Sequence, residues 1–266
     1  MIYSTLLKAI RQAATGRSTI ERRELERVVP GAGLVLLADG VGGLDLCGFG
    51  MKKALADINS PLELHVINWC HGHGRWFADL TDTANHRRFA DAVAAQAIEY
   101  RDRYPAAPIH LIGKSGGSAV IVKALESLPR DFVQTSVLLA PALASRYDLS
   151  RALRAVEHKM YVYWSPYDVF ILGVGTRVFG TVDRRKSYAA GLTSFQLPDE
   201  SADPDRAAVY AKLRQVRWRS EMASTGNLGG HIGPDNPGFL KKYIVPLLSS
   251  TDRIEPLESG RSRSLE

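Results

Sequence analysis

Short, mostly apolar runs alternate along this chain with longer stretches in which apolar residues recur at helical spacing. The apolar runs cover 34–38, 62–69, 109–112, 133–140 and 160–164, and a last short one lies at 216–219. Runs of this length between turn residues are typical of strands that are buried on both faces of a sheet. The pattern therefore predicts a strand at each of these positions.

The stretches between these runs carry the three- and four-residue spacing of helices. The predicted helices cover 5–28, 83–103, 118–128, 149–158, 203–214 and 236–248. Asp203 and Pro204 are a capping acid and a proline suited to the first helical position. Strands that alternate with helices predict an α/β fold with a mostly parallel central sheet and helices on both faces.

The length and composition predict a single domain. The chain has 266 residues, of which 45% are hydrophobic, and this is enough for one large α/β core. We expect residues 1–250 to form this domain, beginning with the N-terminal helical segment. Residues 251–266 are charged and rich in serine, and we expect them to be a disordered tail.

The first residues predict neither a membrane span nor a leader. No apolar run approaches the roughly 20 residues that cross a bilayer. Lys8 and Arg11 interrupt the apolar positions between Met1 and Ala14, which is unlike a signal peptide. We therefore expect a cytoplasmic protein. A leader or membrane anchor removed from the natural chain is the alternative that this pattern leaves open.

Charge and cysteine content exclude further classes of protein. The net charge is +6, and arginines cluster at 184–186 and 214–219. Such clusters can attract nucleic acid. No nucleic-acid-binding motif accompanies them, so solvated surface charge is favoured and no nucleic-acid partner is expected. The two cysteines, Cys47 and Cys70, are too few for a disulfide scaffold and are interpreted as reduced thiols.

The sequence Gly113-Lys114-Ser115-Gly116-Gly117 lies between a predicted strand and a predicted helix. A serine on such a sharp turn takes a strained backbone conformation that exposes its hydroxyl as a nucleophile. Small residues two positions away on either side leave room for the turn. Gly116 can direct its N–H toward a developing oxyanion. The alternative is a strand-to-helix loop that merely contains a serine.

Two further residues follow later strands in the order expected of a catalytic triad. Asp168 comes shortly after the strand 160–164, and His231 lies in a glycine-rich loop after the last strand. An acid can orient a histidine, and the histidine can then act as general base for Ser115. Asp168 also suits a turn, and Asp183 is the main rival for the role of the acid.

A glycine-rich loop, Asp39-Gly40-Val41-Gly42-Gly43, follows the first strand. A second oxyanion N–H is expected from this loop, and Val41 is the candidate donor. The rival interpretation is a dinucleotide-binding loop. It is disfavoured because the third glycine of that motif is missing.

Two other segments have weaker functional interpretations. His71 and His73, with Cys70 or Asp79, could bind a metal, but no recognised ligand spacing supports this and no metal is expected. These residues are expected to line the rim of the active site. The apolar stretch 169–172 is interpreted as core packing in preference to a wall for an acyl chain.

On these residues, the chain resembles the serine esterases and lipases of the α/β-hydrolase family, from about Gly33 to Leu248. The resemblance implies that Ser115 is the nucleophile, that His231 is the general base and then the acid, and that Asp168 orients His231. It also implies an oxyanion hole made of Val41 and Gly116, and no cofactor. The implied substrate is a small-molecule or lipid ester.

The chain departs from many members of this family at two points. Lys114 stands where many lipases have histidine, and Asp39-Gly40 stands where many members have His-Gly. Both differences alter the charge near the pocket. Between 140 and 160 there is room for only one helix, so the usual place of a cap domain is nearly empty and a fairly open site is expected.

The leading functional hypothesis is a serine hydrolase that cleaves carboxylic esters through an acyl-enzyme intermediate. A thioesterase, amidase or acyltransferase with the same triad is the alternative within enzymes. A non-catalytic binding protein with a hydrolase-like fold is the third possibility, and the presence of all three triad residues argues against it.

Overall fold

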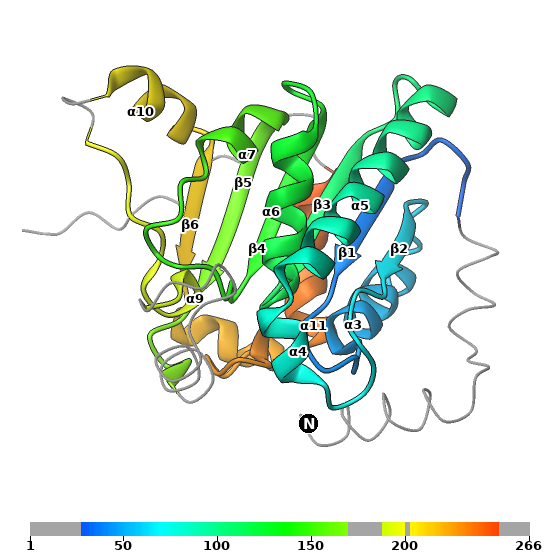
Figure 1. Ribbon diagram of the computed structural model, residues 1–266. Helices are drawn as coiled ribbons and strands as arrows, with labels where there is room; N and C mark the ends of the chain where they lie inside the picture. The colour runs from blue at the N-terminus through cyan, green and yellow to red at the C-terminus, as the bar shows by residue number, and fades with distance from the viewer. Residues whose placement is uncertain (1–27, 170–187, 200–202, 250–266) are drawn as a thin grey trace, which may run out of the picture.

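The computed structural model of the chain describes residues 28–169, 188–199 and 203–249. One sheet of six parallel strands, in the order β2-β1-β3-β4-β5-β6, runs through its centre (Figure 1). The strands are β1 Leu34–Ala38, β2 Glu63–Ile67, β3 Ile109–Lys114, β4 Val133–Leu139, β5 Val156–Trp164 and β6 Leu213–Arg217. The predicted α/β fold with a parallel sheet is confirmed.

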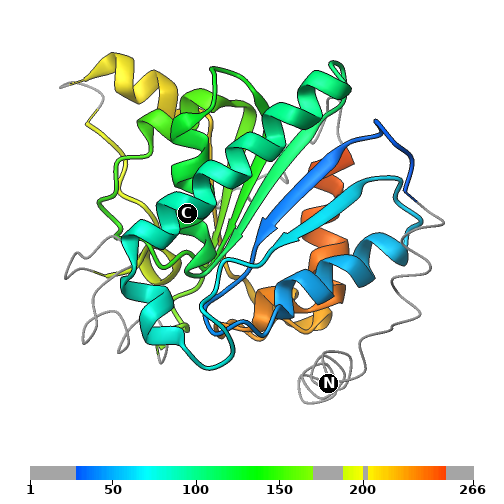
Figure 2. The same ribbon diagram turned by 45° about the vertical axis from the view of Figure 1, so that its right-hand side comes forward.

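Helices cover both faces of this sheet (Figure 2). On one face lie α5 Thr83–Arg103, α6 Gly117–Ser127 and α7 Ser150–Ala155, with α4 Trp76–Thr81 leading into α5 and α10 Pro204–Tyr210 against α7. On the other face lie α3 Leu46–Ala56, α11 Pro237–Phe239, a π-helical turn Leu240–Ile244 and α12 Val245–Ser249. The short helices α9 Ala190–Thr193, Ser220–Thr225 and Gly233–Asp235 lie in the loops.

The continuous apolar runs are explained by the two cores that these layers create. Along β1, Leu34, Leu36 and Ala38 belong to the core beneath α5 and α6. Val35 and Leu37 belong to the opposite core, beneath α3 and the C-terminal helices. Because side chains alternate between the faces of a strand, a strand covered on both sides must be apolar at every position.

The strand order creates a crevice between β1 and β3. From β1 the chain crosses to β2 on one side, and after β2 it returns past β1 to β3 on the other. In a parallel sheet, connections that leave neighbouring strands in opposite directions open a crevice at the carboxyl ends of those strands. The loop 39–43 follows β1 and Ser115 follows β3, so both predicted site segments border this crevice.

Pairing within the sheet moves two predicted boundaries. The predicted helix 149–158 ends at Ala155, because the chain pairs with β4 from Val156 onward. The predicted helix 203–214 ends at Tyr210, and β6 covers 213–217 in place of the predicted 216–219. β6 starts early because Leu213 pairs with Met160 of β5. Ladder hydrogen bonds here outweigh the local helical spacing.

The helix α3 was not predicted, and neither was α4. Gly48 and Gly50 lower the intrinsic helix propensity of α3. Packing requires a glycine at position 50, because a Cβ there would lie 2.2 Å from the carbonyl oxygen of Asp235. A local propensity argument cannot anticipate a contact with a residue so distant in the sequence.

The predicted helix 236–248 is observed, but it is divided. Pro246 has no N–H to donate to the preceding turn, and the helix passes through a π-helical turn directly before α12. The predicted segment 5–27 and the tail 251–266 lie outside the described residues. Within the described part of the chain, no helix is both long and apolar enough to cross a membrane. Between β4 and β5, α7 is the only helix, as predicted.

Candidate active site

Ser115 lies on a strained turn between β3 and α6. Its φ angle is +50°, in the left-handed region that residues other than glycine seldom occupy. The β3 strand ends at Lys114 and α6 begins at Gly117, so Ser115 and Gly116 alone make the reversal. The strained backbone that the motif predicted for this serine is therefore present. Ser115 is buried, with 5% of the residue exposed.

Close contact with the loop after β1 explains the glycines that follow the serine. A Cβ at Gly117 would lie 2.2 Å from the carbonyl oxygen of Ala38 and 2.4 Å from that of Asp39. A Cβ at Gly116 would lie 2.7 Å from Cγ1 of Val41. Since backbone atoms cannot yield as flexible side chains do, position 117 accepts only glycine. The loop after β1 is therefore in contact with the serine turn.

The structure brings Ser115, His231 and Asp168 into one hydrogen-bonded series. The Nε2 atom of His231 lies 2.8 Å from the Ser115 hydroxyl oxygen. Its Nδ1 atom lies 2.6 Å from Oδ2 of Asp168. The Asp168 side chain is 2% exposed and that of His231 is 11% exposed. The rival acid, Asp183, lies outside the described residues.

Lys114 connects the serine turn to the histidine loop. Its Nζ atom donates a hydrogen bond of 2.9 Å to the backbone carbonyl of His231 and lies 3.5 Å from Oδ1 of Asp235. The Lys114 side chain is only 3% exposed. A buried ammonium requires such partners. Lys114 thus points toward the backbone of His231, a contact that its position in the motif does not predict.

The electrostatics around His231 favour its neutral form. Burial lowers the pKa of His231, and the positive charge of Lys114 lowers it further. The hydrogen bond and the charge of Asp168 oppose this shift without cancelling it. A neutral imidazole is the form that can accept the Ser115 proton. His231 is therefore expected to remain neutral, and able to accept a proton, at pH values below the ordinary pKa of histidine.

Two buried acids lie near Lys114, and both have structural contacts. Burial raises the pKa of Asp235 to about 7, against the opposing charge of Lys114. Asp39 accepts hydrogen bonds from the N–H groups of Gly40 (2.7 Å) and Gly48 (2.8 Å). It therefore anchors the first turn of α3 to the end of β1. Burial raises the pKa of Asp39 as well.

Val41 and Gly116, the two residues predicted as oxyanion donors, belong to segments that are in contact beside Ser115. The contact between Val41 and position 116 places the loop after β1 against the start of α6. Within the described part of the chain, the backbone N–H groups of Val41 and Gly116 form no hydrogen bond with another protein group. An oxyanion hole requires backbone N–H groups that are not already bonded to protein acceptors, so both residues remain candidate donors.

The candidate metal ligands bind one another. Both ring nitrogens of His71 contact carboxylates: Nδ1 lies 2.9 Å from Asp79 and Nε2 lies 3.1 Å from Asp82. Among the residues that the structure describes, no group of three or more histidine, cysteine or acidic side chains is arranged to hold a metal ion. Most of the apolar stretch 169–172 lies outside those residues, and Val169 is exposed.

No protein-family model and no curated protein sequence matches this chain. Solved structures are similar to this chain, and two of them are as follows. One, from Xanthomonas campestris pv. campestris, is provisionally described as a hydrolase of the alpha/beta superfamily; it is 15% identical over 78% of this chain and 95% of that one, with a TM-score of 0.39. The other is LpqC, the poly(3-hydroxybutyrate) depolymerase of Bordetella parapertussis, at 14% identity, 77% coverage of each chain and a TM-score of 0.46.

The parallel sheet, its two helix layers and the strained serine between β3 and α6 decide the fold. The chain has the α/β-hydrolase fold. Within this fold, Ser115, Asp168 and His231 follow the strands that the sequence analysis assigned to them. Their order along the chain is the one in which members of this fold carry a nucleophile, an acid and a base.

Two contacts of this candidate site could not be predicted from the sequence. Lys114 was interpreted only as a charge near the pocket, and Asp79 only as a possible metal ligand. A lysine inside an otherwise apolar strand end is a signal for a buried partner, although it does not identify that partner. Asp79 carries no comparable signal, because the N–H groups that donate hydrogen bonds to its carboxylate come close to it only in the folded chain.

Proposed function

We propose that this protein is a serine hydrolase that cleaves carboxylic esters through an acyl-enzyme intermediate. The observation that carries the proposal is the hydrogen-bonded series from the Ser115 hydroxyl through His231 to Asp168, buried at the crevice between β1 and β3. A serine in positive φ beside an uncharged, oriented imidazole is the arrangement that activates a hydroxyl for attack.

In this mechanism His231 Nε2 accepts the proton of Ser115 as the serine oxygen attacks the ester carbonyl carbon. Asp168 holds the imidazole in the tautomer that leaves Nε2 free, and it stabilises the imidazolium that forms. The N–H groups of Val41 and Gly116 donate to the oxyanion of the tetrahedral intermediate. His231 then returns the proton to the departing alkoxide, which leaves the acyl group on Ser115. Water repeats the same steps, releases the acid and restores the serine.

The experiment that tests this proposal combines covalent labelling with turnover. A fluorophosphonate probe should label the protein once, at Ser115, and p-nitrophenyl esters of graded chain length should be hydrolysed. Parallel assays with a matched thioester, an anilide and an added alcohol acceptor separate ester hydrolysis from the other reactions of the same triad. A protein that is neither labelled nor active on any of these acyl donors would be a non-catalytic member of the fold, and the proposal would be wrong.

The pH dependence is expected to show the lowered pKa of His231. Because the neutral base persists to lower pH, kcat/KM should rise with an apparent pKa below the ordinary histidine value of about 6.5. Lys114→Met removes a positive charge that disfavours the imidazolium, so the acid limb should move to higher pH. Profiles measured between about pH 4 and 9 give both values.

A charge-removal control comes from Lys53, which forms an exposed ion pair with Asp57. Lys53→Met should leave the acid limb of the profile unchanged. If Lys114→Met lowered kcat without moving the acid limb, Lys114 would support the fold without tuning His231.

Activity is expected to be independent of added metal. The candidate ligands His71 and Asp79 are engaged with each other, and the proposed mechanism uses protein groups alone. Exhaustive treatment with EDTA followed by dialysis should leave the rate of ester hydrolysis within experimental error of the untreated enzyme. Loss of activity that a divalent ion restores would contradict this and would direct attention to the loop 71–79.

A further inference from the structure

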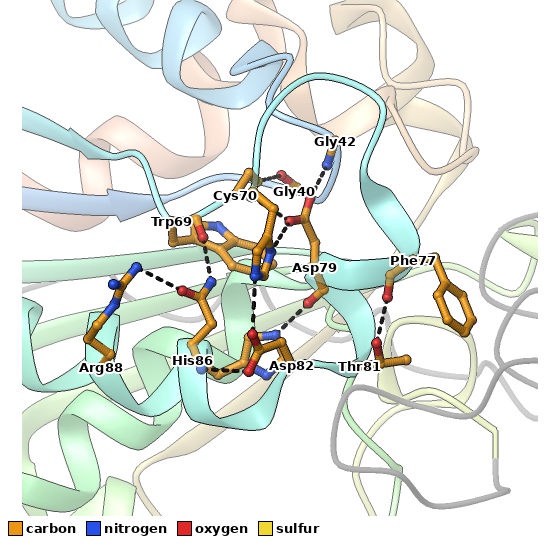
Figure 3. A network of polar contacts seen from close by, with 12 residues as sticks. Gly40, Gly42, Trp69, Cys70, Phe77, Asp79, Thr81, Asp82, His86 and Arg88 are labelled. Carbon is orange, nitrogen blue, oxygen red and sulfur yellow. Dashed lines mark hydrogen bonds and ion pairs between the residues drawn. The ribbon is translucent and has the colours of Figure 1, made fainter.

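The loop after β1, which carries Val41, is held by the segment that follows β2. The indole N–H of Trp69 donates to the Asp39 carbonyl (2.8 Å), and the Cys70 thiol contacts the Gly40 carbonyl (3.4 Å). Figure 3 shows these two segments face to face, with the Asp79 side chain reaching from α4 toward Gly42. Residues 69–79 therefore contact the loop after β1 at Asp39, Gly40 and Gly42.

Asp79 provides the strongest of these contacts. Its side chain is completely buried, and its Oδ2 atom accepts the N–H of Gly42 at 2.8 Å. Its Oδ1 atom accepts the backbone N–H of His71 at 2.7 Å and lies 2.9 Å from the Nδ1 atom of the same residue. Burial alone would raise the pKa of Asp79, but these hydrogen bonds outweigh it and lower the pKa. The carboxylate therefore stays charged, and charge-assisted hydrogen bonds are the strong ones.

The network continues to a rigid element. The Nε2 atom of His71 lies 3.1 Å from Asp82, and Asp82 caps α5 by accepting the N–H of Asn85 at 2.9 Å. The helix α5 spans 21 residues and packs its apolar side on the sheet. Gly42 is therefore connected through Asp79, His71 and Asp82 to one of the main helices of the molecule.

The planarity of peptide groups converts these contacts into an orientation for Val41. The Val41 N–H belongs to the peptide unit of the Gly40 carbonyl, and it points opposite to that carbonyl because the unit is planar and trans. The Val41 carbonyl belongs to the same unit as the Gly42 N–H. Cys70 contacts the first unit and Asp79 the second, so both peptides that flank Val41 are anchored.

We propose that Asp79 is a positioning residue of the oxyanion hole, which directs the Val41 N–H by fixing the Val41–Gly42 peptide. This inference rests on the proposed serine mechanism. Asp79 does not touch the substrate. It acts through Gly42 on a donor that matters only when negative charge develops on the carbonyl oxygen. Its contribution should consequently appear in transition-state stabilisation and not in the binding of the ground-state ester.

The test is the variant Asp79→Asn in the full chain. Asparagine has nearly the same shape, but it replaces one acceptor by an NH₂ group that would face an N–H donor. For a p-nitrophenyl ester that the wild type hydrolyses, kcat should fall about 10- to 100-fold with little change in KM. This is less than the 10²- to 10³-fold loss that follows complete removal of an oxyanion donor. Affinity for a trifluoromethyl ketone, whose hemiketal oxyanion occupies the hole, should fall by a similar factor.

The matched control is Tyr100→Phe. The hydroxyl of Tyr100 accepts the N–H of Gly33 at 3.2 Å, so this variant also removes a buried side-chain contact to the backbone of the β1 region, at its opposite end. It should leave kcat and ketone affinity unchanged. Thermal unfolding of both variants measures the loss of stability separately from the loss of activity.

The outcomes are distinct. If Asp79→Asn retains the wild-type kcat and ketone affinity, the positioning role is wrong while the serine mechanism stands. If kcat of Asp79→Asn falls without weaker ketone binding, Asp79 is only structural. The same conclusion follows if kcat and ketone affinity of Tyr100→Phe fall by as much as those of Asp79→Asn. If the wild type neither hydrolyses the ester nor binds the ketone, the serine mechanism fails and the inference fails with it.

A milder variant covers the case in which Asp79→Asn does not fold. His71→Asn keeps the bond between Asp79 and Gly42 but removes the ring that connects Asp79 to Asp82. Its kcat and ketone affinity should both fall roughly fivefold, as expected for one hydrogen bond. Unchanged values for both would overturn the proposal.

Discussion

Ser115→Ala is expected to abolish fluorophosphonate labelling and to lower kcat for ester hydrolysis by roughly 10⁶-fold, the scale of nucleophile removal in serine proteases. The change removes the one oxygen that lies 2.8 Å from His231 Nε2 and with it the atom that would carry the acyl group. The small residual rate would come from the oxyanion hole and from substrate binding. Active-site titration and steady-state kinetics on the purified variant measure both effects.

The same turn supplies a control for Ser115→Ala. The hydroxyl of Ser118 is buried and donates to the Gly113 carbonyl at 3.1 Å, so it has a local structural contact and no contact with His231. Ser118→Ala should keep both labelling and turnover, with at most a modest loss of thermal stability. Labelling of another serine in the Ser115→Ala protein would contradict the assignment of the nucleophile.

Asp168→Asn is expected to lower kcat by roughly 10⁴-fold while the fold is retained, as the comparable change does in serine proteases. The Oδ2 atom of Asp168 lies 2.6 Å from His231 Nδ1 and accepts a hydrogen bond from its N–H, which keeps that proton on Nδ1. An asparagine amide in that place can donate, which favours the tautomer with its proton on Nε2. That tautomer cannot accept the proton of Ser115. Steady-state kinetics and a thermal-unfolding curve distinguish loss of function from loss of structure.

Asp183→Asn is the matched control for the acid. Asp183 was the rival candidate for the acid, and in the sequence it comes after Asp168 in the stretch that follows β5. We expect Asp183→Asn to retain nearly full activity. A larger loss in Asp183→Asn than in Asp168→Asn would require the acid to be reassigned.

The sheet and the serine turn could be predicted from the sequence because they depend on local information. Each residue of 34–38 must be apolar when both faces of β1 are covered, and this requirement is visible as an uninterrupted run. Glycines at 113 and 117 around a serine, between a strand and a helix, describe a turn that is set by sterics within a few residues. Asp168 and His231 could be assigned to the same site because each comes after the carboxyl end of a later strand.

The support of the site could not be predicted because it depends on contacts between distant residues. Asp79 meets Gly42 across 37 positions, and Lys114 meets the His231 carbonyl across 117. Nothing in the spacing of either residue indicates its partner. The same limit explains α3, where Gly50 opposes the helix propensity and is required only because Asp235 packs against it.

The hydrogen bond between Lys114 and the His231 carbonyl has a consequence for the order in which the protein matures. Contacts that close such long loops are formed late, because the entropy of closure must be overcome before the contact contributes. During synthesis the serine turn would emerge and fold well before the histidine loop exists. The nascent chain would therefore carry Ser115 without its candidate base while residues 116–230 are made. The proposed hydrolytic activity would begin only when the His231 loop has docked on Lys114 and Ser115, so that activity would report late folding.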